Sequence, residues 1–314
     1  MTVPRRGDRI AALSELRQSP WAVRQEMADT LAGLVSRGEV PAVESPELVA
    51  ATEAARALRG RGLEQHGDLA VIPLRGLITP RGSFLSLLFG GGGGLESFRS
   101  SLREALANDD VGGILLDIDS PGGSTDLVTE TAAEIRAARD KKPITAIANT
   151  DAGSAAYALA SQASELVVTP SGEVGSIGVF MLHWDESGLN ERIGINPTYI
   201  YEGRYKIEGN PDEPLSDEAK AAFQAVCKEF YEIFVADVAA GRGVDAGTVR
   251  EKFGEGRMVT AQNAVAAGMA DRVETYEELV ARLTGRAPER PRARQQNTHQ
   301  RTETRALLLA RERH

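Results

Sequence analysis

Short apolar runs alternate with longer helix-like stretches through the central part of the chain, from Asp68 to about Ala240. The first run, Asp68 to Ile78, is rich in branched residues and predicts a buried strand. Such alternation is typical of a mostly parallel sheet covered by helices, because parallel strands need crossover connections. We therefore expect an α/β fold with helices at 95–107, 124–139, 154–161, 187–193 and 216–240, and further strands at 113–118, 144–148, 166–168, 177–182 and 198–201.

The pattern divides the chain into three parts. Residues 1–66 are polar and predict a helical accessory segment. Residues 67–285 carry the alternating pattern and predict the main domain. Residues 286–314 hold eight arginines against three glutamates and few apolar side chains, which predicts a disordered basic tail. A glycine run at 90–94 predicts a loop, either a mobile flap or a linker.

Composition excludes several classes of function. The net charge of −9 would repel phosphate, so we expect no nucleic-acid partner. One cysteine, Cys227, and four scattered histidines argue against a disulfide or a metal centre, and we expect no cofactor. The N-terminus lacks the apolar core of a signal sequence, and no later run is long enough to cross a bilayer. The sequence predicts a soluble, cytoplasmic protein without a membrane anchor.

A glycine turn joins the strand predicted at 113–118 to the helix that follows it. Its sequence is Asp119-Ser-Pro-Gly-Gly-Ser124, and Gly122 and Gly123 let the backbone pass close to a neighbour with its N–H groups pointing outward. Backbone N–H groups just before a helix can form an anion or oxyanion site. A tight turn capped by Ser124 is the alternative explanation.

A second motif, Asp151-Ala-Gly-Ser-Ala-Ala-Tyr157, also lies between a predicted strand and a predicted helix. Ser154 stands among glycine and alanine, which leave room for a substrate carbonyl, and the N–H of Ala155 could supply an oxyanion donor. Ser154 is therefore a candidate nucleophile. The simpler explanation is that Ser154 caps the helix.

A serine nucleophile needs a base, and the sequence offers two candidates. His183 is one, because the other histidines precede the core or lie in the tail. Lys206 is the other, in a loop just past the strand predicted at 198–201. A lysine accepts a proton only in its neutral form, and most loop lysines are merely solvated. The residues alone leave both candidates open.

Four motifs follow one another along the chain: Asp119-Ser-Pro-Gly-Gly123, Gly153-Ser-Ala-Ala-Tyr157, Gly172-Glu-Val-Gly-Ser-Ile-Gly178 and Gly203-Arg-Tyr-Lys-Ile-Glu-Gly209. In this order they resemble the signal peptide peptidase A family of serine peptidases, over a region from Asp68 to roughly Leu283. The likeness implies the ClpP/crotonase fold and a Ser-Lys dyad, with Ser154 as nucleophile and Lys206 as general base. It further implies that Ser176 orients the lysine and that Gly122, Gly123 and Ala155 form the oxyanion hole.

Within this family the chain is most similar to the capsid assembly, or head maturation, proteases of tailed phages. The extra N-terminal segment and the sequence Gly209-Asn210-Pro211 carry this likeness, whereas Ala155-Ala156 stands where many cellular members have two glycines. The resemblance implies polypeptide substrates such as capsid scaffold and portal proteins, a homo-oligomeric ring, and a location in the host cytoplasm or the procapsid. A cytoplasmic enzyme that degrades short peptides and an inert protease-like scaffold protein are the alternatives.

Overall fold

The computed structural model describes residues 20–24, 30, 63–82, 86 and 93–285. Most of the predicted accessory segment 1–66, most of the glycine run at 90–94 and the whole basic tail 286–314 lie outside these ranges. The chain separates into two compact units, residues 1–276 and 277–314. The three-part division made from the sequence therefore stays a prediction.

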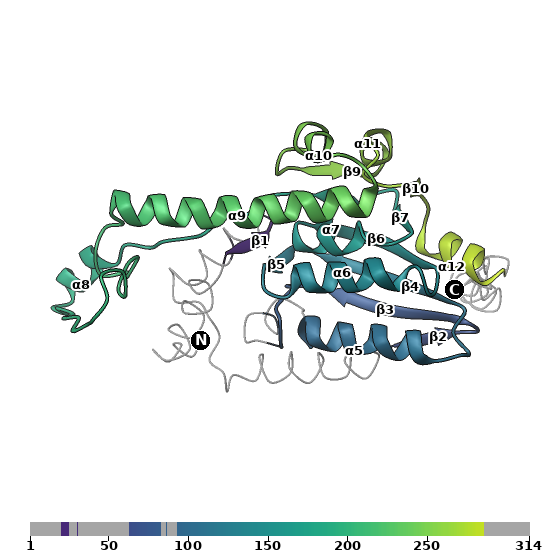
Figure 1. The fold of residues 1–314 in the computed structure, drawn as a ribbon, viewed down its shortest axis with the longest axis horizontal. Coiled ribbons are helices and arrows are strands. Elements are labelled where there is room, and N and C mark those ends of the chain that lie inside the picture. The colour runs from purple at the N-terminus through teal and green to yellow at the C-terminus, as the bar shows by residue number, and fades with distance from the viewer. Residues whose placement is uncertain (1–19, 25–29, 31–62, 83–85, 87–92, 286–314) are drawn as a thin grey trace, which may run out of the picture. The chain divides into compact units, whose positions relative to one another are not determined.

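An eight-stranded, mostly parallel sheet forms the centre of the first unit (Figure 1). This confirms the mixed α/β architecture that the alternating pattern predicts. Its parallel strands lie side by side in the order β10 (Arg272–Val273), β7 (Glu165–Val168), β6 (Ile144–Gly153), β4 (Gly113–Ser120) and β3 (Leu69–Arg75).

Shorter strands extend this sheet. β2 (Glu64–His66) pairs antiparallel with β3 at one edge. β8 (Glu173–Gly175) pairs in parallel with the last residues of β6 and antiparallel with β9 (Met258–Thr260). Separately, β1 (Trp21–Val23) and β5 (Gly122–Ser124) form a two-stranded antiparallel sheet.

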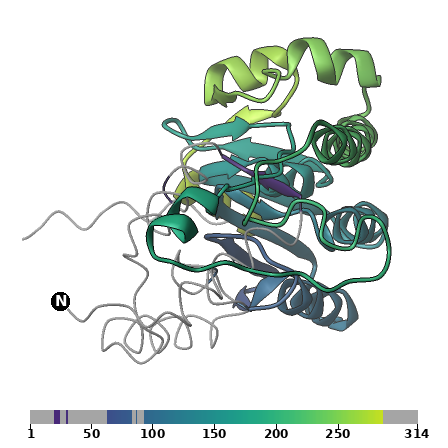
Figure 2. The same cartoon turned by 90° about the vertical axis from the view of Figure 1, so that its left-hand side faces the viewer.

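Three of the longer helices, α5, α6 and α9, lie on one side of the sheet (Figure 2). The short helices α10 and α11 come after the C-terminal end of α9 and lie beside β9. α7 starts directly after β6 and packs against it and against α6 and α9. The second unit contains α12. The helices are α5 (Gly94–Ala107), α6 (Val128–Ala138), α7 (Ala155–Ala160), α8 (Ser187–Arg192), α9 (Asp217–Arg242), α10 (Ala246–Lys252), α11 (Ala261–Ala267) and α12 (Tyr276–Thr284).

Apolar side chains explain why these segments fold as they do. In β4, Ile114 to Leu116 and Ile118 are all buried, as is typical of a central strand in a parallel sheet. In α6, Val128, Ala132 and Ile135 recur at helical spacing and face the core. β-Branched and apolar runs thus mark the strands, and one apolar stripe per helix marks the covering layer.

Three sequence predictions differ from the structure. Residues 177–182 form no strand, and Phe180 makes only an isolated bridge with Trp21. Residues 198–201 are exposed and irregular, because no described strand lies beside this β-branched run to accept its backbone hydrogen bonds. The prediction that residues 1–66 are helical is wrong for β1 and β2, which pair as strands with partners distant in sequence.

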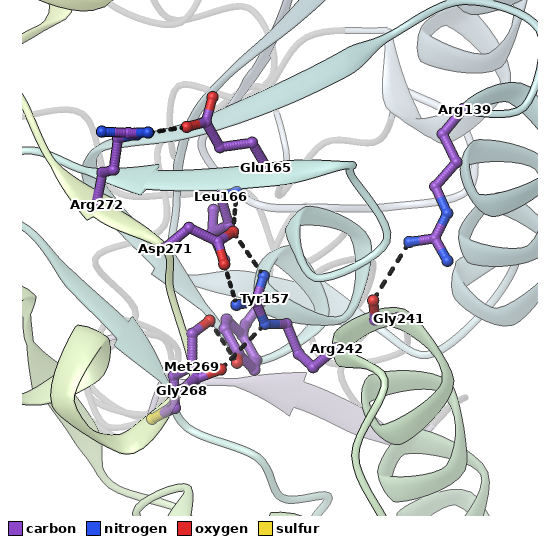
Figure 3. A network of polar contacts seen from close by, with 10 residues as sticks. All are labelled: Arg139, Tyr157, Glu165, Leu166, Gly241, Arg242, Gly268, Met269, Asp271 and Arg272. Atoms are coloured by element: carbon purple, nitrogen blue, oxygen red, sulfur yellow. Dashed lines mark hydrogen bonds and ion pairs between the residues drawn. The ribbon is translucent and has the colours of Figure 1, made fainter.

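A polar network fastens the C-terminal end of α9 to the sheet (Figure 3). The Arg242 guanidinium donates two hydrogen bonds to Asp271, at 2.9 and 2.7 Å, and a third to the Gly268 carbonyl at 3.1 Å. Asp271 also accepts the N–H of Leu166 at 2.7 Å. Beside them, the hydroxyl of buried Tyr157 donates to the Met269 carbonyl at 3.0 Å. These bonds tie α7, α9 and β7 together.

Replacing Asp271 by Asn should lower the free energy of unfolding by about 1 to 2 kcal/mol at pH 7, because a charge-assisted, partly screened pair is lost. Burial raises the pKa of Asp271, but the hydrogen bonds from Arg242 and Leu166 lower it more, so the pKa in the folded state lies below its ordinary value. The contribution of Asp271 is therefore present above its unfolded pKa, about 3.9, and is lost as the pH falls through the folded-state pKa.

Urea denaturation of parent and variant at pH 7 and pH 3 tests this prediction. The difference in the free energy of unfolding between parent and variant should be smaller at pH 3 than at pH 7. Glu96→Gln, which breaks an exposed pair with Arg81, serves as the control and should change stability less. An Asp271→Asn variant as stable as the parent at pH 7 would contradict the prediction.

Candidate active site

Ser154 lies at the sharp junction between β6 and α7. Its backbone has φ 53° and ψ −119°, a conformation that costs energy for any residue with a side chain. Its N–H donates to the Gly175 carbonyl at 2.6 Å, and its hydroxyl lies 3.5 Å from the carbonyl oxygen of Gly178. Although Ser154 occupies the N-cap position of α7, its side chain makes no capping hydrogen bond to that helix in the described part of the chain. The simple capping explanation is therefore wrong.

Ser176 occupies the matching position on the neighbouring strand. Gly153 at the end of β6 is the register partner of Gly175 at the end of β8, so the two serines are each one residue past a paired position. Neighbouring strands lie about 5 Å apart, which brings the backbones of Ser154 and Ser176 to the same edge. Ser176 also has a positive φ of 54°, and its N–H donates to the Arg257 carbonyl at 2.8 Å.

The glycine turn passes directly beside Ser154. A Cβ on Gly122, whose φ is +101°, would lie 3.0 Å from the Cβ of Ser154 and 2.3 Å from the carbonyl oxygen of Ala22. A Cβ on Gly123 would lie 1.8 Å from the carbonyl oxygen of Ile78. No side chain fits at either position, and the close approach needs both glycines.

The N–H groups of this turn have different surroundings. The N–H of Gly122 donates to the hydroxyl of Ser120 at 3.2 Å, and that hydroxyl donates to the Gly76 carbonyl at 2.7 Å. The alternative explanation of the turn, a helix cap by Ser124, does not apply, because α6 begins later with Leu127 at its N-cap. Near Ser154, the N–H of Ala155 opens α7 and has no acceptor within that helix.

Neither candidate base touches the serine hydroxyl in a single chain. Lys206 is exposed, and its backbone N–H donates to the Gly203 carbonyl at 3.0 Å. It belongs to the segment between α8 and α9, and Figure 1 shows this segment at the N-terminal end of α9. The Nε2 atom of His183 is buried without a hydrogen-bond partner among the described residues. The structure describes all three side chains and records no hydrogen bond from Ser154 to either candidate.

Sequence reasoning missed the segment that covers this site. β1 pairs with β5, and the Arg24 side chain after it forms ion pairs with Asp151 and Glu173. Three residues are too short to carry a period-2 pattern, so the sequence gives no signal for this strand. Within the described ranges, no three histidine, cysteine, aspartate or glutamate side chains gather in a way that could hold a metal ion.

Comparison with known proteins places the site in a family. The model of Peptidase family S49 matches residues 136–288, which include Ser154, Ser176 and Lys206. Residues 136–288 therefore belong to peptidase family S49. No helix in the described part of this chain is both long and apolar enough to span a membrane.

Two phage proteins and one plant protein are similar in sequence to this chain. The chain is 32% identical over 222 residues to capsid assembly protease C of Escherichia phage lambda, covering 71% of this chain and 50% of that protein. It is 35% identical over 215 residues to a head-tail preconnector protein of Enterobacteria phage P21, covering 68% and 42%. It is 27% identical over 187 residues to the chloroplastic serine protease SPPA of Arabidopsis thaliana, covering 59% and 28%. The chain thus spans half or less of the length of these relatives.

The strained backbone at Ser154 predicts an order of stability among variants. Ser154→Gly should be more stable than Ser154→Ala by about 1 kcal/mol, because glycine alone adopts this positive φ without steric cost. Thermal denaturation of the two variants measures the difference. Ser161, a buried serine with φ −62°, gives the matched control, where glycine should be the less stable replacement. The same order at both positions would contradict strain at Ser154.

Proposed function

We propose that this chain is a serine endopeptidase in which Ser154 attacks the carbonyl carbon of a peptide bond. The observation that carries the proposal is the strained, non-capping serine at a strand-to-helix turn beside a side-chain-free glycine turn. Such turns hold a nucleophile clear of its own backbone, at the cost of strain that the surrounding structure must offset. The match of residues 136–288 to Peptidase family S49 supports the same proposal.

In the proposed reaction, Ser154 Oγ bonds to the carbonyl carbon while its proton passes to a base. The negative charge on the carbonyl oxygen is stabilised by the N–H groups of Gly123 and Ala155. Gly122 shapes the turn and does not donate to the oxyanion, because its N–H already donates to Ser120. The C–N bond then breaks, the amine leaves with the proton, and water hydrolyses the acyl-enzyme.

Lys206 is the base in this proposal, and a neighbouring copy of the chain supplies it. Within one chain Lys206 is exposed and the Ser154 side chain is buried. The segment that carries Lys206 exposes several large apolar side chains, with Ile200 97% exposed. Exposed patches of this kind mark protein interfaces. The exposed side chains are Ile193, Tyr199, Ile200, Tyr201 and Tyr205.

We further propose that the protomers form a closed ring and that the catalytic fold is ClpP/crotonase-like. Head-to-tail contacts generate a ring when the rotation between successive copies brings the last copy back to the first. Each such contact can bring Lys206 of one copy to Ser154 of the next. The names of the two phage relatives favour head proteins, such as scaffold or portal proteins, as substrates in the host cytoplasm or procapsid. Release of peptides from purified scaffold protein by the parent, but not by Ser154→Ala, tests this function.

Mixing two inactive variants tests the shared site. Ser154→Ala and Lys206→Ala should each abolish cleavage of a peptide substrate. Co-expressed at equal levels, they should recover about a quarter of the parent turnover, because random assembly places an intact serine beside an intact neighbouring lysine in that share of sites. His183→Ala should keep most activity on its own. An inactive mixture would contradict a lysine supplied by the neighbour.

Ser176 is proposed to position Lys206 from the adjacent strand end. Ser176→Ala should lower kcat roughly 10- to 100-fold with little change in KM, because a lysine that can rotate away is rarely in the proton-accepting geometry. Steady-state kinetics on one peptide measure both constants. Ser176→Gly also removes the hydroxyl but fits the positive φ, and it should lose as much kcat as Ser176→Ala. Full activity of Ser176→Gly beside a loss in Ser176→Ala would point to a structural role for this position.

A further inference from the structure

β1 lies as the middle strand between two segments that are far from it in sequence. On one side it pairs antiparallel with β5. On the other side Trp21 and Phe180 exchange both backbone hydrogen bonds, at 2.9 and 3.0 Å. Among the described residues, 177–182 has no other strand partner. We call the position between β5 and residues 177–182 the strand site.

The backbone of β1 points the carbonyl of Ala22 toward the glycine turn. Pro20 and Arg24, on either side of it, both make backbone hydrogen bonds to the β5 side, at 3.2 and 3.0 Å. Every second residue of an antiparallel strand bonds to the same neighbour, so Ala22 also faces β5. Its register partner is Gly123. The Ala22 carbonyl therefore faces the N–H proposed as an oxyanion donor.

The same carbonyl lies at the proposed nucleophile. A Cβ on Gly122 would lie 2.3 Å from the Ala22 oxygen and 3.0 Å from the Ser154 Cβ, so both atoms lie beside the same glycine. Ser154 is 0% exposed, and Ala22 is among the residues close to it. The peptide bond between Ala22 and Val23 therefore lies beside both the glycine turn and the serine of the proposed reaction.

Side chains hold the segment in this register. Trp21 is 2% exposed and Val23 is 5% exposed. Arg24 donates a hydrogen bond to Asp151 and forms an ion pair with Glu173 at 3.7 Å. Its methylene stem lies 3.0 Å from the position that a Cβ on Gly153 would take, so the absence of a side chain there makes room for it. The strand site therefore has an acidic pair that binds a basic side chain.

Resting on the proposed function, we infer that residues 20–24 occupy the position of the substrate and compete with it. Their sequence therefore indicates which peptides the site accepts. Substrates are extended peptides that add a strand between β5 and residues 177–182, with a small residue before the cleaved bond and an arginine or lysine two residues after it. Strand addition supplies affinity through the backbone, and the side-chain pockets supply specificity. Cleavage then requires the N-terminal segment to leave the strand site.

Peptide binding to full-length Ser154→Ala protein tests this inference without catalysis. The probe is a fluorescein-labelled peptide of sequence Pro-Trp-Ala-Val-Arg, measured by fluorescence anisotropy. Adding Arg24→Glu should tighten binding at least about fivefold, because the repelled segment no longer competes for the strand site. Trp21→Ala should act in the same direction through lost burial. Arg81→Glu, which breaks the exposed pair with Glu96, is the control and should leave binding unchanged.

A second arm tests the acidic pair. The probe with glutamate in place of arginine should bind the Arg24→Glu protein at least about tenfold more weakly, because two carboxylates face it. Equal affinity of the probe for Ser154→Ala protein with and without Arg24→Glu and Trp21→Ala overturns the inference. So does unfolding of both variants at the assay temperature, since β1 would then be a structural strand. Tight binding with no hydrolysis by the parent would overturn the proposed function and leave this inference standing.

Discussion

The close passage of the Gly122–Gly123 backbone is the constraint on which the rest of the site depends. A side chain at Gly123 would meet the Ile78 carbonyl, and one at Gly122 would meet Ala22 and Ser154. Because no side chain intervenes, β5 can pair with β1 on one edge while the Ile78 backbone bonds to Gly122 and Ser124. The turn therefore brings backbone donors, a paired strand and a serine within reach of one another.

The parallel sheet supplies the second part of this geometry. β6 and β8 end in register, so the residues after them, Ser154 and Ser176, meet at the carboxyl edge of the sheet. Both carry positive φ values, and such strain persists only where the surroundings hold the backbone in place. The N–H of Ser154 donates to Gly175 and the N–H of Ser176 donates to Arg257, and these bonds hold the two backbones together with the buried helix α7.

A single chain holds most of the proposed machinery but separates its base from its nucleophile. Lys206 stays exposed on a segment rich in exposed aromatic side chains, and β1 covers Ser154. Together these two features would keep an isolated protomer inactive in the proposed scheme. Assembly would bring the lysine, and a competing substrate strand would replace β1. In the proposed scheme, the enzyme would act only where copies of the chain and its substrate are concentrated together.

The sequence by itself determined the alternating α/β architecture, because branched apolar runs and helical stripes are local patterns that burial enforces. It also singled out Ser154 and the glycine turn, since short motifs carry their own backbone requirements. Only the tertiary structure decided that Trp21–Val23 is a strand and that residues 177–182 and 198–201 are not. A strand exists only with a partner, and the partner of Trp21–Val23 lies about a hundred residues away. The exposure of Lys206 was equally beyond the sequence, because a loop motif does not determine where its segment lies relative to Ser154.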